Sequence, residues 1–361
     1  MKKSRVKIAI IGIEHVHAWS MYHEFNRDPE RVEWLGCADI SGKTYEAARI
    51  LKERNLAGCD IKLYKDFKEL LDLKPDLVIV CSSIRGYPDA VEESLSRNLN
   101  TLIEKPMAIN FEDAARMYRA YKKSNATFAI NWPVSWYPTF NCVKKLAASG
   151  KVGDILRVHY RSPATLGPYE PGKYKEDELL GMFWYNHSEG GGSAIDYAGY
   201  GCMLATWLFG KQAESVMGIR KNFFLKFSDV EDYSAYLLDF GNGVASIEGS
   251  WSTINNGEIP TGPIVYGSKG VIVADRYKNE VKVYTEFSHQ NTEPNEVYEC
   301  LQWDKREDGL CTNMLDHIQK GTLIDELLTP EFNIKAMAAL DAGIRSSYSG
   351  KAEKTKTVNT P

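Results

Sequence analysis

The chain lacks several features that would place it in a large class of proteins at once. No apolar run approaches the ~20 residues that a membrane-spanning helix needs, so no membrane segment is expected. No lysine- or arginine-rich block is present, and 44 basic residues nearly balance 48 acidic ones, which argues against a nucleic-acid partner. No repeat or low-complexity stretch occurs. These absences favour a small-molecule ligand.

Cysteine pairing motifs and a signal peptide are also missing. The seven cysteines show no C-x-x-C spacing, and several fall inside apolar patterns, which indicates buried, reduced thiols. The apolar run 6–13 contains Lys7 and ends at Glu14 without a small-residue cleavage pattern. It is expected to be a first strand. We therefore expect a cytoplasmic protein.

What the chain does have is enough apolar residues for two cores. It has 361 residues, of which 43% are hydrophobic, and a single core is not expected at that length. We predict a first domain over residues 1–128, a second over 129–350, and a loosely held polar tail from Gly350 over 351–361.

The first third alternates strand and helix patterns, with Asp66, Pro88 and Asn110 as helix-start signals. Parallel strands covered by helices on both faces follow from this alternation. We predict a doubly wound α/β fold with strands over 6–11, 33–39, 61–64, 77–81 and 101–103, and helices over 67–73, 89–97 and 111–123.

The alternation of strand and helix patterns ends at about residue 128. Two long strand patterns, 234–240 and 244–251, are joined through Gly241-Asn242-Gly243, which signals an antiparallel hairpin. The remaining patterns predict an α+β domain with strands over 155–160, 216–221, 271–274 and 281–284 and helices over 310–320 and 332–347.

The turn after the first strand reads Gly12-Ile13-Glu14-His15-Val16-His17. A dinucleotide fold usually has G-x-G-x-x-G here, because a bare backbone lets the pyrophosphate approach the helix N-terminus. Only the first glycine remains. Gly12, Ile13, Glu14 and His15 are the candidate phosphate-binding residues, with an ordinary strand-to-helix turn as the alternative.

Asp39 supports a dinucleotide. It ends the second strand pattern 27 positions after Gly12, near the ~20-residue spacing of a ribose-binding acid. A carboxylate there favours NAD, since it would repel the 2′-phosphate of NADP, which stays the second choice. Alternatively, Asp39 caps the turn 40–42.

His15 and His17 invite a rival hypothesis, because H-x-H after a first barrel strand can bind metal in hydrolases. Such a site needs further ligands at later strand ends, and the other five histidines mostly lie elsewhere in the pattern. We expect no metal site, and we expect His15 and His17 to begin a helix that lines a cleft.

Ser82, Ser83, Glu104 and Lys105 lie at two further strand ends, where open parallel sheets bind ligands. Pro106 biases Lys105 towards an extended backbone, which would place its ammonium at the mouth of the cleft. The alternative is a solvated turn with a capping carboxylate.

Gly190-Gly191-Gly192 precedes an apolar helical pattern over 193–209 in which Asp196 and Tyr200 share a face. Transfer of hydride to or from a carbinol needs a group that exchanges the hydroxyl proton, and tyrosine with a nearby lysine can do this. Lys105 beside Tyr200 would lower the pKa of the phenol from ~10. Alternatively, both residues simply pack in a core helix.

An aromatic group flanks these segments. Its faces suit the apolar sides of sugar rings, although core packing or an oligomer interface competes with that role. The group consists of Trp132, Trp136, Tyr137, Trp184 and Tyr185, followed by Asn186 and His187.

These motifs together resemble the glucose-fructose oxidoreductase, inositol dehydrogenase and rhizopine-catabolism family, Gfo/Idh/MocA, nearly end to end. The resemblance implies an N-terminal Rossmann domain and a C-terminal domain with an open, mostly antiparallel sheet often used in oligomerisation. The matching segments are 102–108, 190–196, 241–243, 267–270 and 342–347.

By this resemblance, Lys105 is the active-site lysine, Asp196 the acid of the catalytic helix and Tyr200 the proton donor or acceptor, where many members have histidine. The sequence departs from the family at Glu14 and His17, at 83–87 where P-N-x-x-H is common, and at Ala198 in place of glycine.

The family resemblance implies an NAD(P)-dependent dehydrogenase that acts on a sugar, polyol or related carbonyl compound, as a homo-dimer or tetramer. A second hypothesis follows from the altered turn: a non-catalytic sensor or scaffold that keeps the fold and binds the cofactor weakly. The sequence does not name the substrate or the direction of the reaction.

Overall fold

The computed structural model describes residues 5–40, 44–163, 167, 172–253, 259–260, 262–290, 292–303 and 309–358. The chain divides into two compact units. The first contains Met1–Trp132, Ser188–Gly190 and Asp308–Ile334, and the second contains Pro133–His187, Gly191–Glu307 and Lys335–Pro361. Two later segments therefore return to the first unit, which the strand and helix patterns do not indicate.

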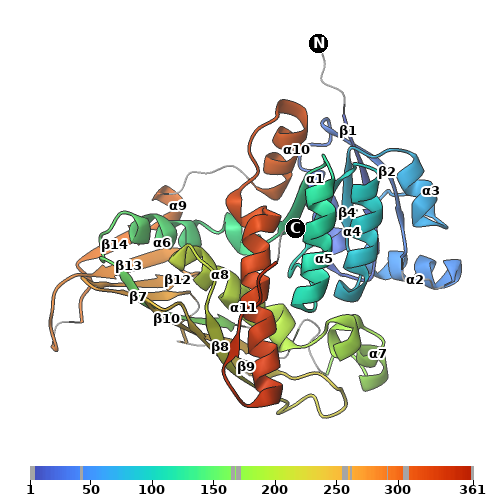
Figure 1. The fold of residues 1–361 in the computed structure, drawn as a ribbon. Coiled ribbons are helices and arrows are strands. Elements are labelled where there is room, and N and C mark those ends of the chain that lie inside the picture. Colours follow the sequence, from blue (N-terminus) through green and yellow to red (C-terminus); the bar gives the residue numbers. More distant parts are fainter. Residues whose placement is uncertain are drawn as a thin grey trace. The chain divides into compact units, whose positions relative to one another are not determined.

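The first unit is built on a six-stranded sheet in the order β3-β2-β1-β4-β5-β6, and every described pair is parallel (Figure 1). This is the predicted Rossmann arrangement. The strands are β1 (Val6–Ile11), β2 (Val32–Ala38), β3 (Leu63–Tyr64), β4 (Leu77–Val80), β5 (Asn100–Glu104) and β6 (Phe128–Asn131).

The helices α3 and α5 begin at the predicted residues, Phe67 and Phe111, whereas the helix predicted from residue 89 begins at Tyr87. The Asp66 carboxylate accepts the Lys68 N–H at 2.8 Å, and the Asn110 side chain accepts the Asp113 N–H at 2.9 Å, which satisfies donors that a helix start leaves open. The helices are α1 (His17–Phe25), α2 (Tyr45–Asn55), α3 (Phe67–Asp72), α4 (Tyr87–Ser96), α5 (Phe111–Lys123) and α10 (Leu310–Lys320).

The second unit contains a nine-stranded sheet in the order β14-β13-β12-β11-β7-β10-β9-β8-β15. Among the described strand pairs of this sheet, only β7 and β10 are parallel, so the predicted, mostly antiparallel sheet is confirmed. The strands are β7 (Ile155–Pro163), β8 (Ser215–Lys221), β9 (Tyr233–Asp239), β10 (Val244–Ser250), β11 (Ile264–Gly267), β12 (Val271–Asp275), β13 (Glu280–Tyr284), β14 (Glu296–Glu299) and β15 (Glu353–Lys354).

The predicted hairpin joins β9 and β10. Phe240 N donates to Gly243 O at 2.8 Å, which closes the turn. The other helices are α6 (Pro138–Ala148), α7 (Glu176–Leu180), α8 (Gly199–Phe209), α9 (Cys300–Trp303) and α11 (Pro330–Ser349).

The helical segment over 194–209 packs closely against strand β10 of the sheet. A Cβ on Gly201 of α8 would lie 2.0 Å from Ile247 of β10, and one on Gly249 of β10 would lie 2.5 Å from the backbone N of Ala198. Glycine on both sides lets helix and strand approach closely. This packing fixes the segment that carries Asp196 and Tyr200.

The prediction of a loosely held tail from Gly350 is wrong for the described residues. β15 pairs antiparallel with β8, Arg345 binds the Glu353 carboxylate and the Lys354 carbonyl, and Thr355 N donates to Glu214 O. The polar composition of this segment predicted few contacts, but its backbone pairs with β8 and Arg345 binds two of its residues. Residues 359–361 lie outside the described part.

Two further findings concern membrane helices and disulfides. Among the described residues, no helix combines the length and the apolar character that crossing a membrane requires. All seven cysteines lie in the described part of the chain, all are buried, and none forms a disulfide.

Candidate functional site

The candidate cofactor-binding residues of the first unit all follow the carboxyl ends of neighbouring parallel strands. Gly12 to His15 follow β1, Asp39 follows β2, Ser82 and Ser83 follow β4, and Glu104 with Lys105 closes β5. Parallel strands bring these ends to one edge of the sheet, which is where such sheets bind ligands.

Gly12 is the residue that lets the first turn form. Its φ of +71° suits glycine, and a Cβ there would lie 2.5 Å from the Ser82 Cβ. The ends of β1 and β4 therefore meet closely at this glycine. Asn55, at the end of α2, holds the turn by donating to the carbonyls of Ile13 and Glu14 at 2.6 and 2.9 Å.

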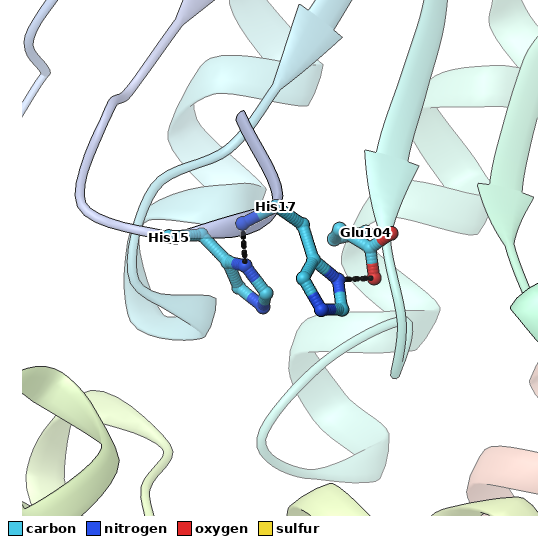
Figure 2. Close-up of side chains that lie close together, drawn as sticks. All are labelled: His15, His17 and Glu104. Carbon is cyan, nitrogen blue, oxygen red and sulfur yellow. Dashed lines mark hydrogen bonds and ion pairs between the residues drawn. The ribbon is translucent and has the colours of Figure 1, made fainter. Parts of the chain in front are cut away.

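His15, His17 and Glu104 form a compact cluster at this edge (Figure 2). The His17 Nδ1 lies 3.2 Å from the Glu104 Oε2, and the His17 backbone N–H donates to the His15 Nδ1 at 3.0 Å. Lys105 N and the Asn131 side chain also donate to the Glu104 carboxylate. Glu104 is thus the anion around which the turn and β5 are joined.

Burial keeps His15 neutral. The ring is fully buried, which lowers its pKa well below the usual value, and the nearby His17 and Lys105 lower it further. Lys105 is itself only 3% exposed, so the alternative of a solvated turn at Glu104 and Lys105 is wrong. The metal hydrolase hypothesis assumed a barrel, whereas the described strands of this unit form an open parallel sheet.

Asp39 and the serines lie beside the turn. Gly12 N donates to Ala38 O at 2.7 Å, which brings the residue after β2 next to the turn after β1. Ser83 Oγ donates to the Glu189 carboxylate at 2.8 Å. The turn that Asp39 could instead cap contains residues 41 and 42, which lie outside the described residues.

In the second unit, the predicted helix over 193–209 begins with a π-helical turn, Ala194–Ala198, and continues as α8. Asp196 lies in the π-helical turn and is 5% exposed, whereas Tyr200 in α8 is partly exposed. π-Helical turns are rare and occur frequently at functional sites.

Glu231 anchors the start of this helix. Its Oε1 accepts the Ala194 N–H at 2.8 Å, its backbone carbonyl accepts the Ser193 N–H, and its Oε2 pairs with Arg220 at 2.9 Å. Gly192 has a φ of +104°, and a Cβ there would lie 2.5 Å from the Glu231 Oε1. The last glycine of the triplet therefore makes room for the carboxylate that caps the helix.

Some of the predicted aromatic substrate contacts pack in a core. Trp132, Trp184 and Tyr185 are at most 3% exposed, and Trp132 Nε1 donates to the Asn333 side chain. Trp136 and Tyr137 are partly exposed. The core-packing alternative holds for the three buried rings.

Three residues of these sites were not predicted from the sequence. Asn55 ends a helix that was not predicted, Glu231 precedes a strand, and His17 was assigned only to a helix start. Their partners lie 11 to 87 positions away in the chain, and no local spacing connects them. Only the spatial proximity of the strand and helix ends reveals these contacts.

Comparison with known proteins gives two matching family models. One, described as an oxidoreductase family with an NAD-binding Rossmann fold, matches residues 6–132. The other, a GFO/IDH/MocA C-terminal domain, matches residues 140–273. Between them they cover well over half the chain.

Individual relatives are distant. An uncharacterized oxidoreductase of Streptococcus pneumoniae is 22% identical over 316 residues, 78% of this chain and 83% of the relative. A myo-inositol 2-dehydrogenase of Thermotoga maritima is 30% identical over 106 residues, 28% of this chain and 32% of that protein.

A solved structure shares the fold. The WlbA dehydrogenase of Bordetella pertussis, in complex with NADH and UDP-GlcNAcA, matches with a TM-score of 0.74 at 16% identity and covers 98% of this chain and 100% of its own.

Proposed function

Because the chain belongs to the GFO/IDH/MocA family of oxidoreductases, with an NAD-binding Rossmann unit, we propose that it interconverts a hydroxyl and a carbonyl group on a sugar, polyol or related compound. One observation carries the proposal: Lys105 is buried at the carboxyl edge of the parallel sheet, next to the turn that follows β1. The inositol dehydrogenase among the relatives supports a polyol-like substrate.

The residues at this edge fit a dinucleotide. Gly12 offers bare backbone beside Ser82, and Asp39, next to the turn, suits the ribose hydroxyls and favours NAD over NADP. Ile13, Glu14, His15, Ser83, Glu104 and Lys105 complete the proposed binding residues. When bound, the nicotinamide supplies the group that gives or accepts hydride.

The chain's own residues handle the proton. Tyr200 exchanges the proton of the substrate hydroxyl, and Lys105 supplies the active-site ammonium from the first unit. Asp196, buried at the start of the same helical segment, orients the groups around the hydroxyl. No protein-bound metal is required for this chemistry.

Turnover and binding measured on one preparation test the proposal. We expect NADH formation when the protein is incubated with NAD⁺ and a panel of aldoses, polyols and uronic acids, with slower turnover on NADP⁺. Calorimetric titration with NADH serves as the companion measurement. Tight binding of NADH with no turnover on any compound would instead favour the non-catalytic sensor, and a failure to bind NADH would contradict both functions.

The same proposal includes a compartment and an assembly. Seven buried cysteines without a disulfide suit a reducing cytoplasm.

One face of the second unit's sheet presents apolar side chains to solvent. Met217, Ile219 and Leu237, on neighbouring strands, are 47%, 54% and 52% exposed. They line a hollow of about 350 Å³ together with His159, Ser246 and Glu248. A second copy of the chain covers this face, giving a dimer or a tetramer.

Charge on that face should separate the copies. We expect Ile219→Glu combined with Leu237→Glu to elute as a monomer in light-scattering chromatography, because carboxylates cannot be desolvated in an apolar interface without cost. Leu323→Glu, at a 91% exposed leucine of the first unit, is the control and should keep the assembly of the unmodified protein. An unmodified protein that is already monomeric would refute the interface.

A further inference from the structure

Arg276 carries a positive charge that no carboxylate of the described residues pairs with. It follows β12, and its guanidinium carbon lies 5.4 Å from the ring centroid of Tyr137 and 4.9 Å from that of Tyr277. In the described part of the chain its hydrogen-bond acceptor is the Tyr277 hydroxyl, 3.1 Å from Nη2. A guanidinium has several N–H donors in one plane, and Arg276 is partly exposed. Most of these donors are therefore available to a ligand.

The carboxylate next to Arg276 in the chain is engaged elsewhere. The Asp275 Oδ1 accepts the backbone N–H groups of Tyr277 and Lys278 at 3.0 and 3.1 Å, and its Oδ2 lies 3.6 Å from the Lys278 Nζ. Burial lowers the pKa of Arg276, whereas the phenol groups of neighbouring tyrosines raise it. Aromatic rings and hydroxyls thus hold the arginine in place without cancelling its charge.

The amino end of α6 lies beside this charge, because Tyr137 is the N-cap residue of that helix. No side chain caps the helix, and its first turn contains no acidic residue, although the N–H groups of a helix start favour an anion. Thr139, in this first turn, is fully buried. Within the described residues, neither its hydroxyl nor the buried Trp136 Nε1 has a hydrogen-bond partner. Buried polar groups normally have one, so this region offers donors that await an acceptor.

Tyr160 connects this region with the helix that carries Tyr200. Tyr160 of β7 pairs with Ile247 of β10, and a Cβ on Gly201 of α8 would lie 2.0 Å from the Ile247 side chain. Burial raises the pKa of Tyr160 to about 12, and the Arg276 charge opposes this rise. Cross-strand pairs share a face of the sheet. Arg276 is thus on the face that α8 covers, three strands from β10 in the sheet order, or ~14 Å at the usual strand spacing.

We propose that Arg276, together with the amino end of α6, binds a carboxylate or phosphate group of the substrate. The substrate is then an acidic or phosphorylated sugar or polyol. The planar fork of an arginine matches the oxygens of both groups. A neutral sugar would leave the guanidinium, the Thr139 hydroxyl and the Trp136 N–H without an anionic acceptor. The inference rests on the proposed function, because it names the substrate class of the same reaction.

The test compares charged compounds with their neutral parents by equilibrium binding, which does not depend on turnover. The full-length protein, with and without NADH, is titrated at constant ionic strength with glucuronate, gluconate and glucose 6-phosphate, and with glucose and glucitol. We expect at least one charged compound to bind about 10-fold or more tightly than its neutral parent, the worth of one charge-assisted hydrogen bond. Inorganic phosphate is the further probe and should bind more weakly than the charged sugar.

Variants assign that preference to one side chain. Arg276→Gln should lose the preference for the charged compound and keep its affinity for the neutral one, whereas Arg276→Lys should retain part of it. Lys278→Gln removes an equal charge two positions further on, at an exposed lysine, and should match the unmodified protein. In steady-state kinetics, Arg276→Gln should raise KM for the charged compound and leave kcat nearly unchanged.

The competing role of Arg276 is a structural clamp between α6 and the end of β12. Equal losses of affinity for charged and neutral compounds in Arg276→Gln, with a lower melting temperature, would establish the clamp and refute the inference. So would an unmodified protein without preference for charge, or one that binds inorganic phosphate as tightly as the charged sugar. If a charged compound binds through Arg276 but no NADH forms from any compound, the anion site stands and it is the proposed function that fails.

Discussion

Replacing Lys105 by methionine is expected to lower kcat by about 10²–10⁴-fold, the usual contribution of a positioned acid-base group. Methionine preserves the length and the burial of the side chain and removes only the ammonium. Tyr200→Phe should lower kcat by a similar factor, because phenylalanine keeps the ring and loses the exchangeable proton. Steady-state kinetics on the best substrate of the panel, with NADH affinity measured in parallel, gives both numbers.

The double variant decides whether the two residues serve one proton transfer. If they do, Lys105→Met combined with Tyr200→Phe should be about as slow as either single variant, since groups that act as a unit are not additive. Multiplicative losses would mean that they act separately. Tyr197→Phe provides the matched control, because Tyr197 is also partly exposed and its ring centroid lies 6.1 Å from that of Tyr200. A similar loss of activity in Tyr197→Phe would contradict a specific role for Tyr200.

The second large effect concerns stability. Arg220→Leu should lower the free energy of unfolding by about 3–5 kcal/mol, because it leaves Glu231 as an uncompensated buried charge. The side chains of Arg220 and Glu231 are 10% and 8% exposed, with 2.9 Å between Arg220 Nη1 and Glu231 Oε2. Chemical denaturation at neutral pH measures the loss. Arg116→Leu, at an exposed arginine bound to Asp89 and Glu92, should cost less than about 1 kcal/mol.

The same variant should respond to pH in a defined direction. Burial raises the pKa of Glu231 above its usual value, and Arg220 opposes that rise. A carboxyl whose pKa is higher in the folded than in the unfolded state binds its proton more tightly when folded, so it lowers stability as the pH rises through that window. Without Arg220 the folded pKa rises further. The Arg220→Leu variant should therefore recover part of its lost unfolding free energy as the pH falls from neutral to 5. If its loss of unfolding free energy relative to the unmodified protein is equal at both pH values, the buried charge is not the cause.

The sequence predicted the elements whose signals are local. Apolar runs with cap residues located β1 and α5, and Asn110 caps α5 through its side chain. The glycine pair around Asn242 located the β9–β10 hairpin. In each case the residues that decide the structure are neighbours in the chain, so propensity and capping chemistry suffice.

The remaining features depend on contacts that the chain order hides. Glu104 was recognised as part of a motif, yet its partner His17 is 87 positions earlier. The role of Glu231 depends on the start of the 194–198 turn and on Arg220, and β15 is held by β8, a strand far back in the chain. The sequence indicated which chemical groups are present at the sheet edge; only the folded backbone shows which of them pair.

The close packing of β10 against the helical segment 194–209 has a consequence for Asp196, which we propose as a catalytic residue. Side chains alternate along a strand, so β10 directs Ile247 and Gly249 towards the helix and Ser246 and Glu248 into the hollow on the opposite face. A Cβ on Gly249 would lie 2.5 Å from the backbone N of Ala198, so the helical turn that carries Asp196 packs directly against the backbone of that strand. A partner bound in the hollow on one face of β10 would therefore be separated from the helical turn that carries Asp196 by a single strand.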